Sequence, residues 1–427
     1  MVDRIRQHLT HDIIPFWKSL RDDEYGGYYG FLDYDHNLDR KAVKGCILNS
    51  RILWFFSSAY TLLKDESLLD EARHAYEFMT EHCIDKTYGG IYWSMTYEGD
   101  VFDATKHTYN QAFAIYALSA YFEASRDVRA LDLAEELFSL IETKCKDKIG
   151  YKEASNEKFI EAKNDKLSEN GVMADRTMNT LLHVLEAYTE LYRVGRDIKV
   201  KKCLEDILSL WADKIYNPEL KRQEVFFDNN YRSLIDLHSY GHDIETSWLI
   251  DRTVEVIDED HKLCDRIQPI TKALCDKIYE VAFDGHSLAY ENDRGKVNTG
   301  RVWWVQAETV VGFINAYQKS GELDTKYLDA AKNCLDFIFD HVVDRRTDFV
   351  TGSLDAEDKL SGKAHNDGDS EISSIIKGTE WYYEVTRDGD PVKNLPIVEP
   401  WKCPYHNGRM AVEVLRRLGG DAEKEGT

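Results

Sequence analysis

Two kinds of helical segment alternate along the chain. In the first kind apolar residues occupy all sides, as in ILWFFSSAYTLL after Arg51, QAFAIYALSAYF after Asn110 and WWVQAETVVGFINAY after Val302. In the second kind an apolar stripe faces a charged one, as in SLLDEARHAYEFMTEH from Ser67 and VRALDLAEELFSLIETK from Val128. A helix that is apolar all round must be buried, whereas an amphipathic helix covers a core from outside. The pattern therefore predicts inner helices surrounded by outer helices.

Short segments rich in glycine and aromatic residues separate these helix pairs. They begin at residues 25, 88, 149, 223, 284 and 379. Each alternates aromatic residues with Gly, Asp or Asn, which is typical of a β-hairpin or tight turn. The spacing is 61 to 74 residues, except for a last interval of 95. Such a period indicates a sixfold repeat of helical hairpins.

Six inner and six outer helices predict an all-α (α/α)6 barrel, as a single domain over residues 1–427. An open solenoid of stacked helix pairs is the alternative. Turns on one side only and inner helices that are apolar all round favour the closed ring. Links from inner to outer helices are short, and links from outer to inner helices carry the β-hairpins. We therefore expect the N-terminal ends of the inner helices to gather at the hairpin-bearing face.

A polar segment at about residues 345–378 accounts for the long last interval. It is rich in Gly, Ser and Asp. We expect a solvated insertion, and the alternative is a lid near the mouth of the barrel.

The starts of the predicted inner helices carry polar groups that are unusual for apolar helices. These are Arg51, Tyr109, Asn110, Asn179, His183, His242, Glu245, Glu308, His406 and Arg409. One histidine in an apolar helix is more often a hydrogen-bonded core residue than a catalyst. Three histidines at equivalent ends of three inner helices favour a functional site at one mouth of the barrel.

The residue types in this set suit proton transfer on a sugar. Histidines can accept and donate protons near pH 7. Arg51 could stabilise an enediolate oxygen, because its charge does not titrate away. Glu245, one turn after His242, is expected to orient that imidazole and raise its basicity. Trp304, Trp401 and Tyr109 offer flat apolar faces to a sugar ring, although Trp303, Trp304 and Trp401 could also be core aromatics.

Metal binding is the competing use of these histidines, with His242, Glu245 and Glu308 as one conceivable ligand set. The sequence has no HExxH motif, no acidic calcium loop, and neither GxGxxG nor GxxxxGK[ST]. We therefore expect no metal and no cofactor.

The composition limits the classes of molecule that the protein is expected to bind. The net charge of -23 argues against nucleic acid and against an anionic membrane surface. From the charged first residues we expect no signal peptide, and the sequence has no apolar window of about 18 residues, so we expect a cytoplasmic location. The eight cysteines are dispersed without a CxxC pair, which predicts free thiols.

Six segments together resemble the cellobiose 2-epimerase branch of the N-acylglucosamine 2-epimerase superfamily. They are CILNSRILWFFS, KHTYNQAFAIYALS, NTLLHVLEAYTELYR, YGHDIETSWL, WWVQAE and WKCPYHNGRM, and the resemblance runs from about residue 5 to 418. It implies an (α/α)6 barrel that epimerises C2 of the reducing-end glucose of β-1,4-linked disaccharides, by ring opening, a cis-enediolate and reprotonation on the opposite face. The expected substrates are cellobiose, lactose, mannobiose and longer cello-oligosaccharides, and we expect a monomer.

The resemblance also implies residue roles. His406 and His242 would form the acid/base pair on opposite faces of C2. His183 would help to open and close the ring, and Arg51 would hold the O1/O2 side. Further substrate contacts would come from Tyr109, Asn179, Glu245, Trp304, Glu308 and Trp401.

Three other functions stay open at this point. A mannose isomerase or an N-acetylglucosamine 2-epimerase would share the barrel and histidines, but WKCPYHNGRM and the Trp303–Trp304 pair favour the disaccharide branch. A six-hairpin glycoside hydrolase would need two carboxylates, for which Glu245 and Glu308 could serve, but it would leave the histidines unexplained. A sugar-binding protein without catalysis would not need proton-transfer groups.

Overall fold

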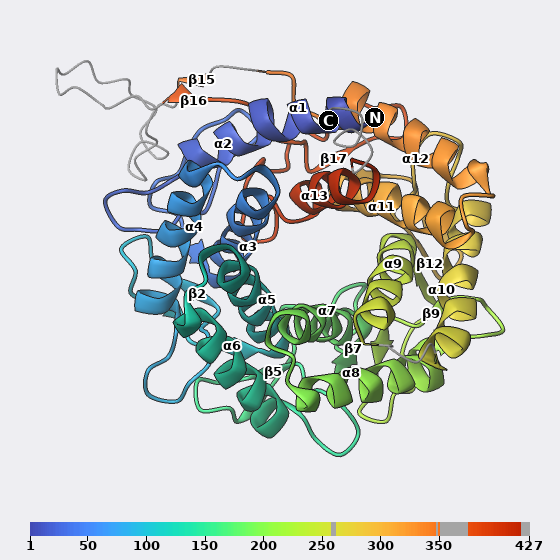
Figure 1. Ribbon diagram of the computed structural model, residues 1–427, viewed down its shortest axis with the longest axis horizontal. Coiled ribbons are helices and arrows are strands. Elements are labelled where there is room, and N and C mark those ends of the chain that lie inside the picture. Colours follow the sequence, from blue (N-terminus) through green and yellow to red (C-terminus); the bar gives the residue numbers. More distant parts are fainter. Residues whose placement is uncertain (258–261, 347–348, 351–374, 420–427) are drawn as a thin grey trace, which may run out of the picture.

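Two concentric rings of helices make up the protein (Figure 1). The computed structural model describes residues 1–257, 262–346, 349–350 and 375–419. The inner ring consists of α3 (Cys46–Leu63), α5 (Thr108–Ser125), α7 (Met178–Gly195), α9 (Tyr240–Ile257), α11 (Trp303–Lys319) and α13 (His406–Leu418). The outer ring contains α4 (Glu66–Phe78), α6 (Val128–Leu140), α8 (Ile198–Leu210), α10 (Lys262–Val281) and α12 (Thr325–Phe337). The predicted all-α (α/α)6 barrel is confirmed.

The N-terminal segment fills the sixth outer position and closes the ring. It runs as α1 (Val2–His8), the π-helical turn η1 (Leu9–Ile13) and α2 (Ile14–Ser19). Both α1 and η1 contact α13, the last inner helix, while α13 contacts its inner neighbours α3 and α11. The first helix of the chain is thus the outer partner of the last. Closure buries inner-helix sides that an open solenoid would expose to water, so the solenoid alternative is excluded.

Three inner helices pass to their outer partners by the same two-residue link. The first residue is left-handed, with φ between +57° and +61°, and ends the inner helix. The second is an aspartate whose side chain accepts the backbone N–H two residues later and caps the outer helix. These links are Lys64–Asp65, Arg126–Asp127 and Arg196–Asp197. The expectation of short inner-to-outer links is confirmed for these repeats.

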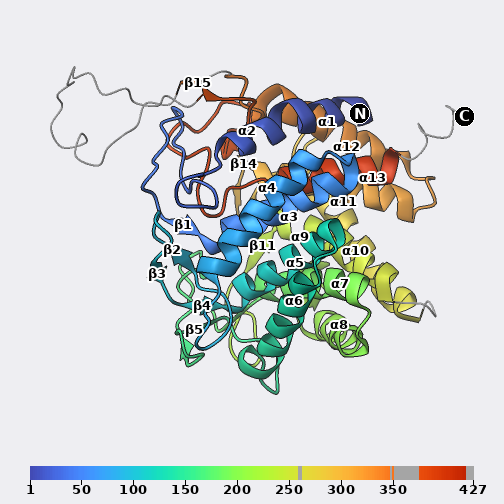
Figure 2. The same ribbon diagram turned by 60° about the vertical axis from the view of Figure 1, so that its left-hand side comes forward.

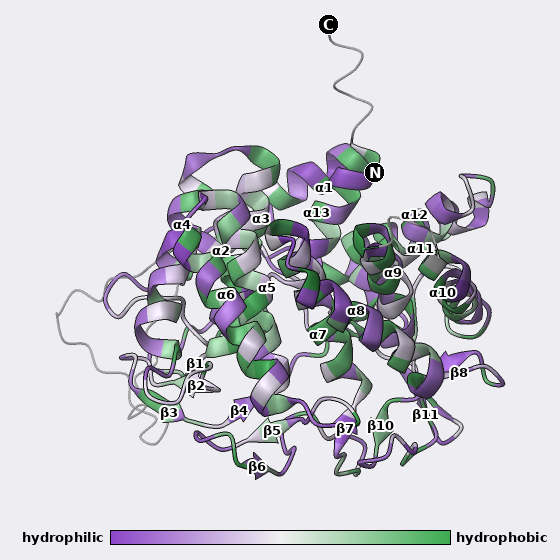
Figure 3. Ribbon diagram, turned by 60° about the horizontal axis from the view of Figure 1, so that its bottom comes forward, coloured by the Kyte–Doolittle hydropathy of each residue, from purple (hydrophilic) through white to green (hydrophobic). Residues whose placement is uncertain are grey.

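The short strands gather at one end of the barrel, where the inner helices begin (Figures 2 and 3). Three sheets have three strands: β1 (Lys44–Gly45), β2 (Ser94–Met95) and β3 (Val101–Asp103); β4 (Lys106–His107), β5 (Ala154–Ser155) and β6 (Glu161–Ala162); and β11 (Leu237–Ser239), β12 (Glu291–Asp293) and β13 (Lys296–Asn298). The antiparallel pairs are β7 (Arg176–Thr177) with β10 (Phe226–Phe227), β8 (Tyr216–Asn217) with β9 (Arg222–Gln223), β14 (Arg301–Val302) with β17 (Glu384–Val385), and β15 (Phe349–Val350) with β16 (Ile375–Ile376).

This strand pairing differs in part from the predicted pattern, in which each repeat forms its own β-hairpin. The strand that precedes an inner helix pairs with a strand of the following repeat, as β1 does with β2 and β4 does with β5. An isolated bridge between Leu32 and Val398 joins the first repeat to the last at the same end. Backbone hydrogen bonds between repeats therefore hold the inner-helix starts in a fixed arrangement.

Four of the repeats also share an ion pair with a buried cation at this end. The cation lies on the strand before an inner helix, and the aspartate lies in the turn after an outer helix. Each pair has a nitrogen-to-oxygen distance of 2.6 Å: Lys44–Asp22, Lys106–Asp85, Arg176–Asp147 and Arg301–Asp284. Every pair binds a turn to the start of an inner helix. These ion pairs therefore help to fix the helix starts that carry the polar groups of the mouth.

The substitution Lys106→Met should lower the free energy of unfolding by about 3 kcal/mol, because it leaves the buried Asp85 carboxylate without its cation. Neither side chain of this pair is exposed to solvent. Urea unfolding followed by circular dichroism measures the change. The control Lys202→Met removes an exposed ion pair of 3.7 Å and should change stability by less than about 0.5 kcal/mol. Equal stability of Lys106→Met and the wild type would contradict this role.

The predicted insertion at about 345–378 falls largely outside the described residues. Its two ends pair as β15 and β16, and β16 contacts α2. The choice between a solvated insertion and a lid concerns residues beyond that description. Of the helices that the structure describes, none has the length and apolar character needed to cross a membrane.

Candidate active site

A cavity of about 990 Å³, its opening to solvent included, occupies the hairpin-bearing mouth of the barrel. Nine of the ten site residues predicted from the sequence line it: Arg51, Tyr109, Asn179, His183, His242, Glu245, Trp304, Trp401 and His406. Most of them lie in the first two turns of parallel inner helices, and the closed ring turns those positions toward a common axis. Residues separated by more than 350 positions in the chain meet there.

Each of the three histidines is held through its Nδ1 atom. His183 Nδ1 lies 2.8 Å from Glu186 Oε2, and His406 Nδ1 lies 2.8 Å from Glu308 Oε1. His242 Nδ1 lies 2.7 Å from the Ser239 hydroxyl. Because Nδ1 is occupied in every case, Nε2 is the nitrogen that remains for a molecule in the cavity. A hydrogen bond to one ring nitrogen fixes the role of the other.

The expectation that Glu245 orients His242 is wrong. The imidazole of His242 turns back to Ser239, three residues earlier. The carboxylate of Glu245 instead binds the guanidinium of Arg409 on α13. Spacing along one helix places two residues on the same face, but the buried cation from another helix attracts the carboxylate more strongly than a neutral imidazole does.

Burial keeps two of the imidazoles uncharged. It lowers the pKa of His242 to about 3, with a smaller contribution from His183. Burial also lowers the pKa of His406 well below its usual value, and the nearby Arg409 and Arg51 add to this effect. Near pH 7 both rings are therefore neutral while the cavity is empty, so a neutral Nε2 can act as a base.

Arg51 is a buried cation that hydrogen-bonds neutral groups. Its Nη2 donates to the Tyr109 hydroxyl at 2.8 Å, and its Nη1 donates to the backbone oxygen of Trp401 at 3.1 Å. The guanidinium carbon lies 4.2 Å from the ring centre of Phe113 and 4.7 Å from that of Tyr405. Among the residues that the structure describes, no carboxylate is within ion-pair distance, and Nε has no hydrogen-bond partner. A buried, uncompensated cation favours an anion in the cavity.

Comparisons with known proteins agree with this geometry. The sequence profile of the N-acylglucosamine 2-epimerase (GlcNAc 2-epimerase) family matches residues 26–376. The chain belongs to that family. A cellobiose 2-epimerase of Ruminococcus albus is 47% identical, with 98% of this chain and 99% of the relative aligned. One of Eubacterium cellulosolvens is 46% identical, with 96% and 97% aligned. A crystal structure of a sugar epimerase from a ruminal bacterium has a TM-score of 0.89 at 46% identity and covers 98% of this chain and 99% of its own.

In this epimerase Glu308 lies behind His406 and does not line the cavity, which differs from the expected substrate contact. Its side chain has no solvent exposure. Oε1 binds His406 and lies 2.7 Å from Arg409 Nη2, while Oε2 accepts the indole N–H of Trp248 at 2.9 Å. Glu308 is one helical turn deeper than Trp304, so it reaches the histidine and not the cavity.

Glu245, Glu308 and His406 form a cluster with the ligand types of a metal site. One ligand atom from each lies within 4.8 Å of the others. The guanidinium of Arg409 contacts both carboxylates, so a positive charge already lies between them. A metal ion at this position would have to displace that cation.

Several residues of the site were missed or left without a role by sequence reasoning. Glu186, Ser239 and Arg409 each hold a group of the site, and each lies three residues from a predicted histidine; Glu186 and Arg409 share a helix with theirs, while Ser239 ends β11 just before α9. The same spacing rule would have found Glu186 and Arg409. The loop between β6 and β7 carried no signal, but its residues 166, 167, 169 and 170 line the cavity. Asn170 reaches Glu291 of β12 at 3.1 Å, which fixes this loop across the mouth.

Proposed function

We propose that this epimerase converts the reducing-end glucose of β-1,4-linked disaccharides to mannose, and back, by inverting C2. Cellobiose would give glucosyl-mannose, and lactose would give epilactose. The relatives that align over nearly the whole chain are named cellobiose 2-epimerase, which supports a disaccharide substrate. The cavity opens to solvent and has Trp303, Trp304 and Trp401 in its wall, which offer flat apolar faces to sugar rings.

One observation carries the proposal. Three imidazoles whose Nδ1 atoms are hydrogen-bonded line the same cavity as a guanidinium that has no carboxylate partner among the described residues. Epimerisation next to a carbonyl needs a proton acceptor, a proton donor and a cation for the oxygen that becomes negative. A protein that only binds sugar needs none of these buried groups.

The reaction begins with ring opening. His183 Nε2 takes the proton of the O1 hydroxyl, the C1–O5 bond breaks, and O5 receives the proton as C1 becomes an aldehyde. Arg51, near O1 and O2, polarises the carbonyl and so makes the hydrogen on C2 more acidic. Asn179 and Tyr109 hold the open chain, while Trp304 and Trp401 stack on the sugar faces.

The proton transfer at C2 then uses two histidines. His406 Nε2 takes the proton from C2, and the electrons of that bond form the cis-enediolate with its charge at Arg51. Rotation about C2–C3 presents the opposite face. His242, neutral while the cavity is empty, takes up a proton from water beside the negative enediolate and donates it to C2, while His406 releases its proton to water. In the reverse reaction His242 takes the proton from C2 and His406 donates one. The same two residues therefore serve both directions.

The geometry of the site argues against a glycoside hydrolase. Hydrolysis needs two carboxyl groups on either side of the scissile bond. Glu308 does not line the cavity, and Arg409 binds both it and Glu245. Mannose isomerisation and N-acetylglucosamine epimerisation would use the same groups. The identity of the product therefore distinguishes these two activities from disaccharide epimerisation.

The test is incubation of cellobiose with the protein in D2O containing EDTA, followed by NMR of C2–H. We expect glucosyl-mannose with deuterium at C2, at a rate that EDTA does not change. Parallel incubations contain mannose or N-acetylglucosamine. Free glucose from cellobiose would indicate a hydrolase, a ketose as main product would indicate an isomerase, and preference for N-acetylglucosamine would indicate the sibling epimerase. Loss of activity with EDTA would refute a metal-free reaction.

A further inference from the structure

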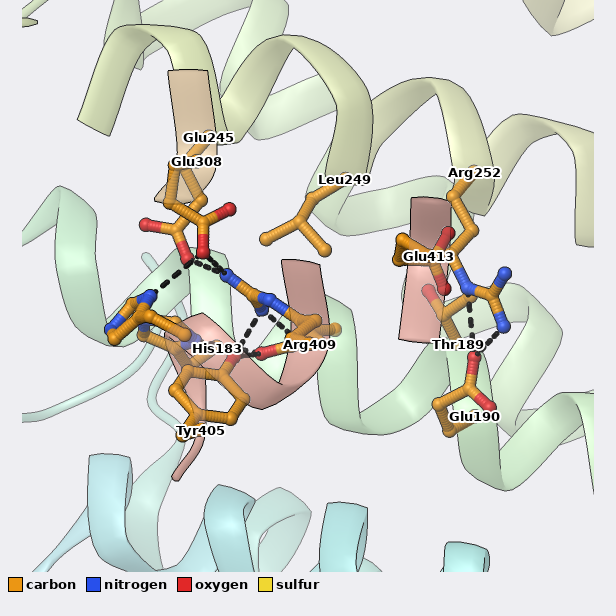
Figure 4. A network of polar contacts seen from close by, with 12 residues as sticks. His183, Thr189, Glu190, Glu245, Leu249, Arg252, Glu308, Tyr405, Arg409 and Glu413 are labelled. Atoms are coloured by element: carbon orange, nitrogen blue, oxygen red, sulfur yellow. Dashed lines mark hydrogen bonds and ion pairs between the residues drawn. The ribbon is translucent and has the colours of Figure 1, made fainter. Parts of the chain in front are cut away.

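One arginine outside the cavity connects its own inner helix to three others at the site. Arg409 lies on α13, three residues after His406, and only 1% of it is exposed. Its guanidinium binds Glu186 of α7 at 2.5 Å, Glu308 of α11 at 2.7 Å, and Glu245 of α9 (Figure 4). It also contacts the Tyr405 hydroxyl. Arg409 is not among the residues that line the cavity, so it does not act by touching substrate.

Two of these carboxylates are the groups that hold catalytic imidazoles. Glu186 binds His183 Nδ1 and Glu308 binds His406 Nδ1, both at 2.8 Å. An ionised carboxylate only accepts hydrogen bonds, so each Nδ1 must carry the hydrogen. Each Nε2 then presents a lone pair to the cavity. His242 differs, because the Ser239 hydroxyl can donate or accept and permits either tautomer.

The ionised state of these carboxylates depends on Arg409. Full burial disfavours a carboxylate and raises the pKa of Glu308, while Arg409 opposes that rise. Arg409 is also the largest favourable influence on Glu186, whose pKa lies at about 2. Without this cation, Glu308 would bind a proton, its O–H would donate to His406 Nδ1, and Nε2 would carry a hydrogen in place of the lone pair.

We propose that Arg409 is a positioning residue that sets the tautomers of His183 and His406 at once, by keeping Glu186 and Glu308 ionised. This inference rests on the proposed function, in which both rings act as bases through Nε2. One cation thereby joins ring opening, at His183, to C2 deprotonation, at His406. The competing explanation is that Arg409 only fastens α13 to α7, α9 and α11.

The test compares Arg409→Met with the control Arg252→Met. Arg252 is an arginine of α9 farther along the barrel axis, bound to Glu190 at 2.6 Å and separated from Arg409 by Leu249 (Figure 4). Both variants lose ion pairs inside the barrel and should lose stability. Arg409→Met should lower kcat about 10²-fold at pH 7 with little change in KM, because a base is lost while the cavity is intact. Arg252→Met should retain the wild-type kcat.

The pH profile distinguishes a tautomer effect from loss of packing. In Arg409→Met the acidic limb of the kcat/KM profile should move up by about one pH unit or more, because Glu186 and Glu308 must lose protons before the bases form. Activity should therefore recover in part at high pH. NMR of protein with 15N-labelled histidine should place the His406 proton on Nδ1 in the wild type and on Nε2 in Arg409→Met, with the signal assigned by its loss in His406→Asn.

An unchanged tautomer, a kcat loss equal at every pH, or the same profile shift in Arg252→Met would overturn the inference. If Arg409→Met does not fold, Arg409→Lys keeps the charge with fewer donors and should retain the Nδ1–H tautomer with a smaller loss of kcat. Absence of C2 exchange in the wild type would refute the proposed function itself. An active wild type with an unshifted Arg409→Met profile would refute the role of Arg409 alone.

Discussion

The variant His406→Asn should epimerise cellobiose about 10³- to 10⁴-fold more slowly than the wild type, because one of the two groups that exchange protons with C2 is gone. His242 remains on the opposite face. In D2O it should still remove and return the C2 hydrogen of one epimer, so that epimer gains deuterium without becoming its partner. NMR of C2–H measures both rates, starting in turn from cellobiose and from glucosyl-mannose.

The matched control is His74→Asn, which changes a histidine of the outer helix α4 that binds the backbone oxygen of Gly27. It should epimerise at the wild-type rate. In the reciprocal variant His242→Asn, the C2 hydrogen of the other epimer should exchange with deuterium. Full epimerisation by His406→Asn, or deuterium entry into the same epimer in both histidine variants, would contradict a two-base reaction.

The variant Arg51→Met should lower kcat about 10²- to 10³-fold, with a smaller change in KM. The guanidinium has no carboxylate partner among the described residues, so its charge is available to the enediolate and acts mostly after substrate has bound. Steady-state kinetics with cellobiose gives the two constants separately. The C2 exchange rate should fall by the same factor as kcat, since both require the enediolate.

Stability provides the control for Arg51. Its removal leaves no buried carboxylate unpaired, so Arg51→Met should unfold at nearly the wild-type urea concentration, in contrast to Lys106→Met. Arg51→Lys keeps the charge but loses the planar fork and should have an intermediate kcat. A large loss of stability with an unchanged kcat would show that Arg51 serves the fold and not the reaction.

The arrangement of helices follows from the sequence to a large extent. The contrast between α3, buried on all sides, and α4, apolar on one side, reveals the two rings, and the spacing of the turns reveals six repeats. The closing contact between α1 and α13 was not visible, because each segment alone is an ordinary amphipathic helix. Strand pairing between repeats was missed for a similar reason, since strands of two or three residues carry too little periodicity to identify their partners.

The cavity residues were found, but not all of their contacts. Position at the start of an inner helix was enough to place His183, His242 and His406 around one cavity. The same reasoning predicted that Glu245 orients His242, because spacing along a sequence reveals only which residues are neighbours on one helix. The actual partner, Arg409, comes from a helix more than 160 residues later.

The sequence by itself determined a sixfold helical barrel, the end of it that carries polar groups, and the three histidines among them. Periodicity and helix starts are local properties, so they can be read from a single chain. The tertiary structure alone decided that Glu308 holds His406 from behind, that Glu245 binds Arg409, and that Arg51 has no carboxylate partner among the described residues. Those features depend on buried charges from different helices. Burial makes such charges select partners by distance and complementarity, which the sequence order does not record.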